Sequence, residues 1–299
     1  MCIGVRSSES AGIGKMTINR TGPIAAAAVA AMIAVLPAGF ALARSYTPDL
    51  SVFQYGCDEG KKCTDVAGFR DYVTQLNEAL SPAYMGPAKT LGYRGFEITY
   101  SVGFTPVGSG GAYWSDRQDG QPGLEDNPGN HYFTNQLRIR KGLPYSIQLG
   151  GSVTHMFESS LWGIGLDVSW AFVEGYRKAP DVSLAVSVGT VLGAADLLNV
   201  NLNAALIISK SIAIAGLFSI EPYAGYNLMF VSAGTHLVPG WDPSGYGEPF
   251  AVGPEYILRH RLEAGMNVVV ENFMFGGTMM LDFQSVRVGG SVRVGVRFW

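Results

Sequence analysis

From about residue 93 to the C-terminus, apolar residues alternate with small or polar residues in one segment after another. The clearest segment is 162–172, whose even positions are Trp, Ile, Leu, Val, Trp and Phe and whose odd positions are Gly, Gly, Asp, Ser and Ala. Because strand side chains point alternately to opposite faces, this pattern predicts strands with one apolar and one polar face. We predict ten strands, at residues 93–105, 131–141, 144–156, 160–173, 181–192, 197–210, 216–231, 256–270, 273–284 and 286–298.

The two faces differ in a way that indicates a membrane. The apolar face carries Trp and Phe, whereas the polar face is rich in Gly, Ser and Asn, as at Asn199, Asn201 and Asn203. This is typical of a transmembrane antiparallel β-barrel, which is apolar outside and polar inside. Segment 162–172 would be about 33 Å long and, when tilted by roughly 40°, about 25 Å tall, the height of an outer-membrane apolar band. The segment 131–141 fits the alternation least well, since Asn135 falls among its outward positions.

The connections support the count of ten. The two longest, 106–130 and 232–255, both follow odd-numbered strands and so fall at one end of the barrel. The tightest, Gly142-Leu143 and Glu271-Asn272, fall at the other end. Outer-membrane barrels join their strands by short periplasmic turns and longer external loops, which fits both termini of the barrel being periplasmic. Eight or twelve strands are the alternatives.

Residues 1–43 are predicted to be a leader with a cleavable signal peptide. Met16 is the preferred start; Arg20 precedes an apolar run from Ile24 to Phe40, and Ala41-Leu42-Ala43 follows. Small residues at this spacing after a short apolar run are typical of a secretory cleavage site, here before Arg44. The alternative is a retained N-terminal transmembrane helix.

Residues 44–89 differ from the strands that follow and form a separate segment. Phe69, Val73, Leu76 and Leu80 are spaced as on one face of a helix over 69–80, which would end near Pro82. We expect this helix at the periplasmic mouth or as a plug inside the barrel. Cys57 and Cys63 enclose a polar loop, which in an exported chain predicts a structural disulfide. A redox motif is the weaker alternative, because the spacing is not Cys-x-x-Cys.

Composition narrows the function. After removal of the leader, 256 residues carry a net charge of −5, which argues against nucleic acid as a partner. No further apolar run is long enough for a transmembrane helix, so none is expected. Residues 90–299 are assigned to the barrel. We predict no cofactor and no metal site. The loop from Asp116 to Asp126 has the oxygen ligands that calcium prefers but lacks their regular spacing.

The phased strands place charged residues on the inner face. The acidic members are Glu97, Asp167, Glu221, Glu263 and Asp282, and the basic members are Arg138, Arg140, Arg261, Arg287, Arg293 and Arg297. Arginine stays charged and can bridge carboxylates bidentately, which suits a partly desolvated network. The network could be a structural plug of ion pairs or a charged constriction in a narrow channel. Ten strands favour the plug, because small barrels are largely filled by their own side chains.

With its leader, alternating strands and terminal aromatic residue, the chain resembles the bacterial outer-membrane β-barrel superfamily over about residues 90–299. The resemblance implies location in the outer membrane, contact with its lipid, and recognition of a terminal Phe or Trp by the barrel-assembly machinery. Here Val292, Val294, Val296 and Phe298 are one residue out of phase with Trp299. No functional subfamily is indicated.

We therefore predict a non-enzymatic barrel, either structural or a narrow channel for ions or small solutes. The main alternative is a lipid- or peptide-modifying enzyme with a site at the rim, using His155 near Ser152, Ser159 and Ser160, or using His260. No acidic residue can be assigned to orient either histidine. A soluble exported β-sandwich is the third interpretation. Loops 106–130 and 232–255 could contact an external partner, whose identity the sequence does not indicate.

Overall fold

A computed structural model describes residues 50–56, 62–81, 86–107, 131–176, 178–214, 216–240 and 247–298. The proposed leader, Trp299, Cys57 and most of loop 106–130, including its acidic residues, lie outside these ranges. The signal peptide, the role of Trp299 and the calcium argument therefore stay predictions. None of the described helices combines the length and the apolar character that a membrane crossing requires.

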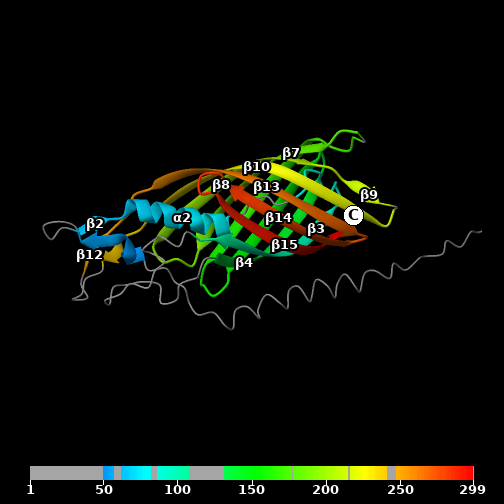
Figure 1. Ribbon diagram of the computed structural model, residues 1–299. Helices are drawn as coiled ribbons and strands as arrows, with labels where there is room; N and C mark the ends of the chain where they lie inside the picture. The colour runs from blue at the N-terminus through cyan, green and yellow to red at the C-terminus, as the bar shows by residue number, and fades with distance from the viewer. Residues whose placement is uncertain are drawn as a thin grey trace, which may run out of the picture.

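Ten long strands close into an antiparallel barrel (Figure 1), which confirms the predicted fold class and strand count. The ring is closed by the pairing of β10 with β13. In chain order the strands are β3 (Phe96–Pro106), β4 (His131–Leu143), β5 (Ile147–Met156), β6 (Trp162–Val173), β7 (Asp181–Leu192), β8 (Leu197–Ser209), β10 (Phe218–Thr235), β13 (Glu255–Val270), β14 (Phe273–Asp282) and β15 (Arg287–Phe298).

The two faces of the wall have opposite polarity, as the alternation predicts. On β6, Leu166 and Trp170 are 64% and 52% exposed, whereas Asp167 and Ser169 are 3% and 2% exposed. A surface of Leu, Val, Ile and aromatic side chains would be costly in water but is stable against lipid. Asn135, at an outward position of β4, is nevertheless buried and pairs across the strands with Val102 and His155.

Short elements lie at both ends of the barrel. β9 (Ile212–Ile214) pairs with the first residues of β10. β11 (Val238–Gly240) and β12 (Gly247–Phe250) form a small two-stranded sheet within the segment 232–255 that the sequence predicted to be only a loop. We call the end with β11, β12 and connection 107–130 the long-loop end. The opposite end, with the tight turn Glu271-Asn272, is the short-turn end.

The N-terminal module, residues 50–80, comprises η2 (Leu50–Phe53), β1 (Gln54–Gly56), β2 (Lys62–Thr64) and α2 (Val66–Leu80). Asp65 caps α2 by accepting a hydrogen bond from the Gly68 amide at 2.8 Å. Phe53 and Phe69 meet edge to face with ring centroids 5.5 Å apart. The hairpin pairs Gly56 with Lys62 and Tyr55 with Cys63.

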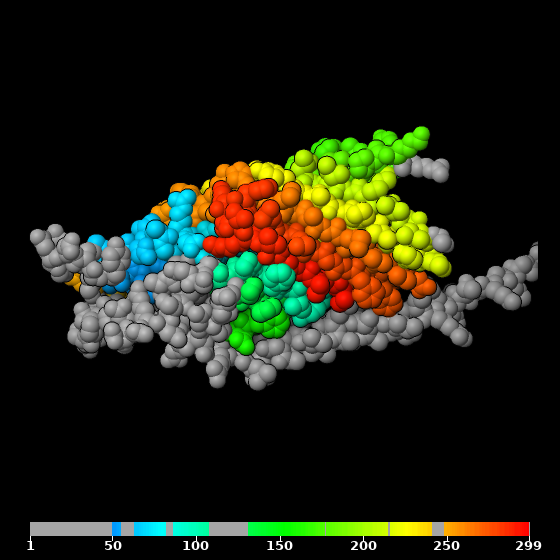
Figure 2. Space-filling view, viewed as in Figure 1, coloured from blue at the N-terminus to red at the C-terminus, as the bar shows by residue number. Residues whose placement is uncertain are grey.

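The N-terminal module lies at the long-loop end of the barrel (Figures 1 and 2), with the C-terminal half of α2 inside its mouth. Phe69, Val73 and Leu76 share one core with Val238, Val231 and Ile257. Of the two placements expected for the helix, the plug inside the barrel is the one observed, and it occupies the long-loop end. Ser81 contacts Asn201 inside the lumen, and Ala88 contacts Ser209 at the end of β8, near the short-turn end where β3 begins.

Candidate functional site: the plugged lumen

The inward charges that the sequence singles out are brought together in the lumen. Glu97, Asp167, Glu221, Arg261, Glu263, Asp282, Arg293 and Arg297 are buried, as are Arg138 and Arg140, while Arg287 is partly exposed. They fall at three depths, which are described in turn from the short-turn end.

The deepest group is built around Glu97 near the short-turn end. Arg140 donates from Nε to Glu97 Oε1 at 2.9 Å, and Arg297 donates from Nε to Glu97 Oε2 at 2.8 Å. Arg297 also binds both carboxylate oxygens of Glu221, at 3.0 and 3.2 Å. Two arginines and two carboxylates thus neutralise one another in a site closed to solvent, where charge-assisted hydrogen bonds are strong.

The middle group joins β4, β6, β10, β14 and β15. Arg138 Nη2 lies 2.6 Å from Asp167 Oδ1. Arg293 donates to the hydroxyl groups of Tyr223 and Thr278, and its guanidinium carbon lies 5.5 Å from the centre of the Tyr223 ring. In the structure Glu97 is held by Arg140 and Arg297, because it pairs across the strands with these two residues.

Arg261 and Glu263 lie on the same face of β13 at a similar depth. Arg261 Nη2 donates to Asn203 Oδ1 at 2.7 Å and to Asn227 Oδ1 at 3.0 Å. Among the described residues, Glu263 Oε1, Arg261 Nη1 and both side-chain polar atoms of Asn267 have no hydrogen-bond partner. Buried donors and acceptors of this kind are ordinarily satisfied by water, so we expect this part of the lumen to be hydrated.

The third group ties the plug to the wall at the long-loop end. Glu78 of α2 lies 3.3 Å from both Arg259 and Arg287, and Arg287 also contacts Asp71 at 3.2 Å. Arg259 is held in turn by Asp282 at 2.6 Å. Burial raises the pKa of Glu78 above its ordinary value, an effect that the neighbouring Arg287 and Arg259 oppose.

The sequence did not identify the residues of α2 and Arg259 as members of the site. Asp71 and Glu78 fall on the polar side of the predicted helix. Glu78 is buried with every other residue from Tyr72 to Leu80, whereas the Asp71 side chain is 47% exposed. An available signal was Asn77, an amide on the turn between Val73 and Leu80. Its Nδ2 donates to Asn199 Oδ1 at 3.2 Å, while its Oδ1 accepts from Asn199 and Asn201 at 3.1 and 3.0 Å.

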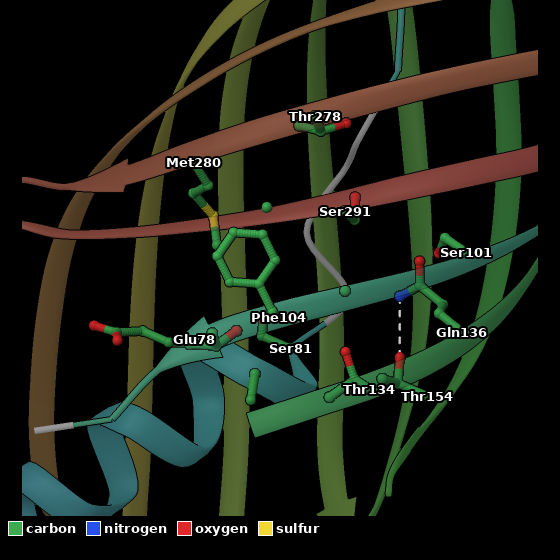
Figure 3. A pocket seen from close by; sticks show the side chains of 14 residues that line it. Glu78, Ser81, Ser101, Phe104, Thr134, Gln136, Thr154, Thr278, Met280 and Ser291 are labelled. Carbon is green, nitrogen blue, oxygen red and sulfur yellow. Dashed lines mark hydrogen bonds between the residues drawn. The ribbon is translucent and has the colours of Figure 1, made fainter. Parts of the chain in front are cut away.

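The plug leaves space along one wall. A cavity of about 40 Å³ lies between the end of α2 and strands β3, β4, β5, β14 and β15 (Figure 3). A second cavity of about 10 Å³ adjoins it beside Arg138, Arg140 and Arg293, and Ser101, Gln136 and Ser291 line both. Gln136 donates to Thr154 Oγ1 at 3.0 Å. Cavities of this size have room for only a few water molecules.

The histidines near the rim do not form a nucleophile–base pair in the described residues. His155 Nε2 lies 3.0 Å from the main-chain oxygen of Ser159, and its ring packs on Trp162 with centroids 4.4 Å apart. The Ser159 hydroxyl donates to the Met156 carbonyl, and Ser152 points into the lumen, away from His155. His260 Nδ1 pairs with the Tyr226 hydroxyl. These contacts fix the rings in the wall.

The described residues contain no cluster of three or more His, Cys, Asp or Glu side chains arranged to hold a metal ion. The buried carboxylates are instead dispersed around the lumen, and Glu97, Asp167, Glu221 and Asp282 each contact arginine. The chemistry available in the lumen is therefore hydrogen bonding and charge neutralisation.

No family model and no curated protein matches the sequence. Similar solved structures include the N-terminal β-barrel domain of OprF from Pseudomonas aeruginosa, at 12% identity and a TM-score of 0.29, which covers 69% of this chain and 99% of that one. The KdgM porin is 9% identical, with a TM-score of 0.33 and coverage of 68% and 99%. The transport unit of the autotransporter AIDA-I from Escherichia coli is 12% identical, with a TM-score of 0.35 and coverage of 78% and 98%.

The likeness to these proteins is one of general barrel architecture. The assignment of this chain rests on its own strands: a closed antiparallel ring with an apolar outer surface and a polar, charged lumen. This is the architecture of bacterial outer-membrane β-barrel proteins.

Proposed function

We propose that the protein is a non-enzymatic anchor in the outer membrane, a barrel that is closed by its own N-terminal segment and an arginine–carboxylate network. The observation that carries this proposal is where residues 77–81 and 86–91 are held in the lumen. Asn77 is hydrogen-bonded to Asn199 near the long-loop end, whereas Ala88 and Leu91 are hydrogen-bonded to Ser209 and Gln148 near the short-turn end. A segment held along the length of the lumen blocks free passage of solutes.

The charge network supports a closed barrel. A conducting constriction keeps its charged groups hydrated so that an ion can exchange with water. Here Glu97 and Glu221 are bound directly by Arg140 and Arg297 at 2.8–3.2 Å, and all four residues are buried. Separating the partners of a buried pair is costly, so these charges are not readily available to a passing ion.

A gated narrow channel is the second candidate, and the two adjoining cavities beside β3, β4 and β15 favour it. If the end of α2 left the mouth of the barrel, the larger cavity, which α2 helps to line, would widen. Small ions or solutes could then reach Arg138 and Arg140 from the long-loop end.

Conductance across a planar bilayer separates the two candidates. We expect no resolvable conductance steps from the unmodified full-length barrel. Asn77→Asp replaces an amide that both donates to and accepts from the Asn199 amide, so it should loosen α2 through loss of a donor and burial of a charge. The matched control is Asn272→Asp in the β13–β14 turn at the opposite end, where the amide donates to the Arg297 carbonyl.

For an anchor, both variants stay silent while limited proteolysis of Asn77→Asp reports a looser α2. Steps that appear with Asn77→Asp alone would support the gated channel in place of the anchor. Steps from the unmodified chain would overturn the closed barrel.

A further inference from the structure

We infer that the chain crosses the lumen once, from the long-loop end to the short-turn end, and so presents its N-terminal module on the outer surface of the cell. This inference rests on the proposed function as a membrane anchor and names what the anchor holds, which is the N-terminal module. The module packs on the β11–β12 hairpin at the long-loop end.

The direction of the segment is set by its partners on β8. Asn77 bonds to Asn199, Ser81 bonds to Asn201 and Asn203, and the Ala88 amide donates to Ser209 Oγ at 2.9 Å. As the segment advances from residue 77 to residue 88, its partners advance from near the start of β8 to its end. Ten residues of strand span about 33 Å, which at a tilt of roughly 40° is about 25 Å along the barrel axis, the height of the apolar band of an outer-membrane barrel.

The two ends of the crossing are fixed at opposite ends of the barrel. At the long-loop end, Phe53 and Phe69 pack in one core with Val238 and Ile257, and Gln54 Nε2 donates to the Glu248 carbonyl at 3.2 Å. At the short-turn end, the Gly142 amide donates to the Gly95 carbonyl at 2.9 Å, and β3 begins one residue later.

The length of the segment allows one crossing. The twelve peptide units between Leu80 and Gly92 reach at most about 40 Å when extended. That distance suffices for one passage of the band and is too short for a passage and a return. The N-terminal module therefore lies on the side of the membrane opposite the start of β3.

The outer side follows from the loops. In outer-membrane barrels the short turns face the periplasm, which is also where β15 ends and β3 begins here. The N-terminal module must then face outward. It is a packed unit, since Phe69, Val73 and Leu76 are fully buried, so the barrel would hold at the surface a small folded head joined to whatever precedes Leu50.

Cysteine accessibility on intact cells tests the outward placement. Ala67→Cys lies on the exposed start of α2, and Tyr93→Cys lies at the short-turn end, where Tyr93 is 67% exposed. We expect a membrane-impermeant maleimide to label Ala67→Cys on intact cells at least tenfold more than the unmodified chain. Tyr93→Cys should be labelled only after the outer membrane is permeabilised. A tag at Ser244, between β11 and β12, reports the long-loop end independently.

Protection of Ala67→Cys on cells whose Ser244 tag is accessible would overturn the outward placement. Labelling of Tyr93→Cys on intact cells with Ala67→Cys protected would overturn it as well, by reversing the barrel in the membrane.

A crosslink tests the crossing itself, independently of orientation. In the double variant Ala88→Cys/Ser209→Cys we expect a disulfide that joins the segment to the end of β8 in the folded barrel, because the Ala88 amide contacts the Ser209 hydroxyl. Ala88→Cys/Ala233→Cys, with the second cysteine on β10 opposite Asn199 at the long-loop end, is the control and should remain reduced. A folded barrel of the Ala88→Cys/Ser209→Cys variant that forms no crosslink between these two positions would overturn the crossing. If these tests fail but the unmodified chain shows no conductance steps, the outward placement is wrong and the barrel is still closed. If the unmodified chain conducts but the cysteines are labelled as expected, the closed-barrel function is wrong and the outward placement stands.

Discussion

Arg297 of β15 and Glu221 of β10 form a bidentate ion pair, with Nη1–Oε1 and Nη2–Oε2 distances of 3.0 and 3.2 Å, although two strands separate them in the wall. The Nε of the same guanidinium binds Glu97 on β3, which neighbours β15 on its other side. One arginine therefore ties together three strands that are not all neighbours, near the short-turn end of the barrel.

This relationship predicts a large effect of Arg297→Ala. Removal of the guanidinium leaves Glu221, and one oxygen of Glu97, buried without the charge that compensates them. We expect the free energy of unfolding to fall by about 3–5 kcal/mol, the usual result of removing one partner of a buried ion pair. Urea unfolding of the barrel in lipid vesicles, followed by tryptophan fluorescence, measures it.

The matched control is Arg70→Ala, the same substitution in an exposed ion pair. Arg70 lies 3.9 Å from Glu255, and its side chain is 53% exposed. Exposed pairs contribute less than about 1 kcal/mol, so unfolding should change little. Comparable losses for the two variants would mean that Arg297 is hydrated and that the network does not act as a plug.

The polarity of the wall predicts a depth-dependent cost of charge on its outer face. Leu166 faces outward near the middle of β6, so Leu166→Arg should lower the stability of the barrel by about 2–4 kcal/mol. Val288 also faces outward but lies next to the first residue of β15, where the same change should cost roughly 0–1 kcal/mol. If urea titrations give equal losses at both sites, the membrane does not surround the barrel as we place it.

The raised pKa of Glu78 predicts how the docking of α2 in the barrel depends on pH. Burial raises the pKa of this carboxyl above its ordinary value of 4.5 in spite of Arg287 and Arg259. A carboxyl whose pKa is raised on folding binds its proton more tightly in the folded state. Its contribution to docking therefore becomes more favourable as the pH falls through the raised pKa towards 4.5, and is lost as the pH rises.

The variant Glu78→Gln removes this titration. Arg259 keeps Asp282, and Arg287 keeps Asp71, so neither arginine is stranded by the change. The measurement is the unfolding midpoint of the N-terminal module in the unmodified chain and in Glu78→Gln at each pH. As the pH falls from 8 to 5, we expect the midpoint of the unmodified chain to rise relative to that of Glu78→Gln. A gap that widens in favour of Glu78→Gln as the pH falls would show that the ion pairs outweigh burial.

Much of the barrel could be predicted because its side chains are sorted by a local rule. Alternation of period two fixes both the strand and its face, and all ten strands lie within four residues of their predicted bounds. The hairpin of β11 and β12 was missed because its strands are only three and four residues long, too short for alternation to be recognised.

The site was only partly predictable, because the plug contacts depend on where a distant segment travels. Inward phase placed Arg287 and Arg297 in the lumen, but no pattern in the sequence states that α2 enters at the long-loop end. The contacts of Glu78 with Arg259 and Arg287 therefore could not be predicted from the sequence. The partners of Glu97 could not be predicted either. Arg140 and Arg297 lie opposite Glu97 because of the register between paired strands, which the alternation within a single strand does not determine.

The remaining prediction concerns the hairpin of the N-terminal module. β1 and β2 pair Gly56 with Lys62 and Tyr55 with Cys63, and Cys57 follows Gly56 directly in the sequence. We expect a disulfide between Cys57 and Cys63, and non-reducing peptide mapping should recover the two cysteines in one crosslinked peptide pair.

Closing a loop of this length stabilises by about 2 kcal/mol in the chain-entropy model. The double change Cys57→Ser/Cys63→Ser should therefore make the module more sensitive to protease. The urea midpoint of the barrel should stay the same, because its ten strands form a ring that does not include the hairpin. Free thiols in the oxidised, folded protein would contradict the prediction.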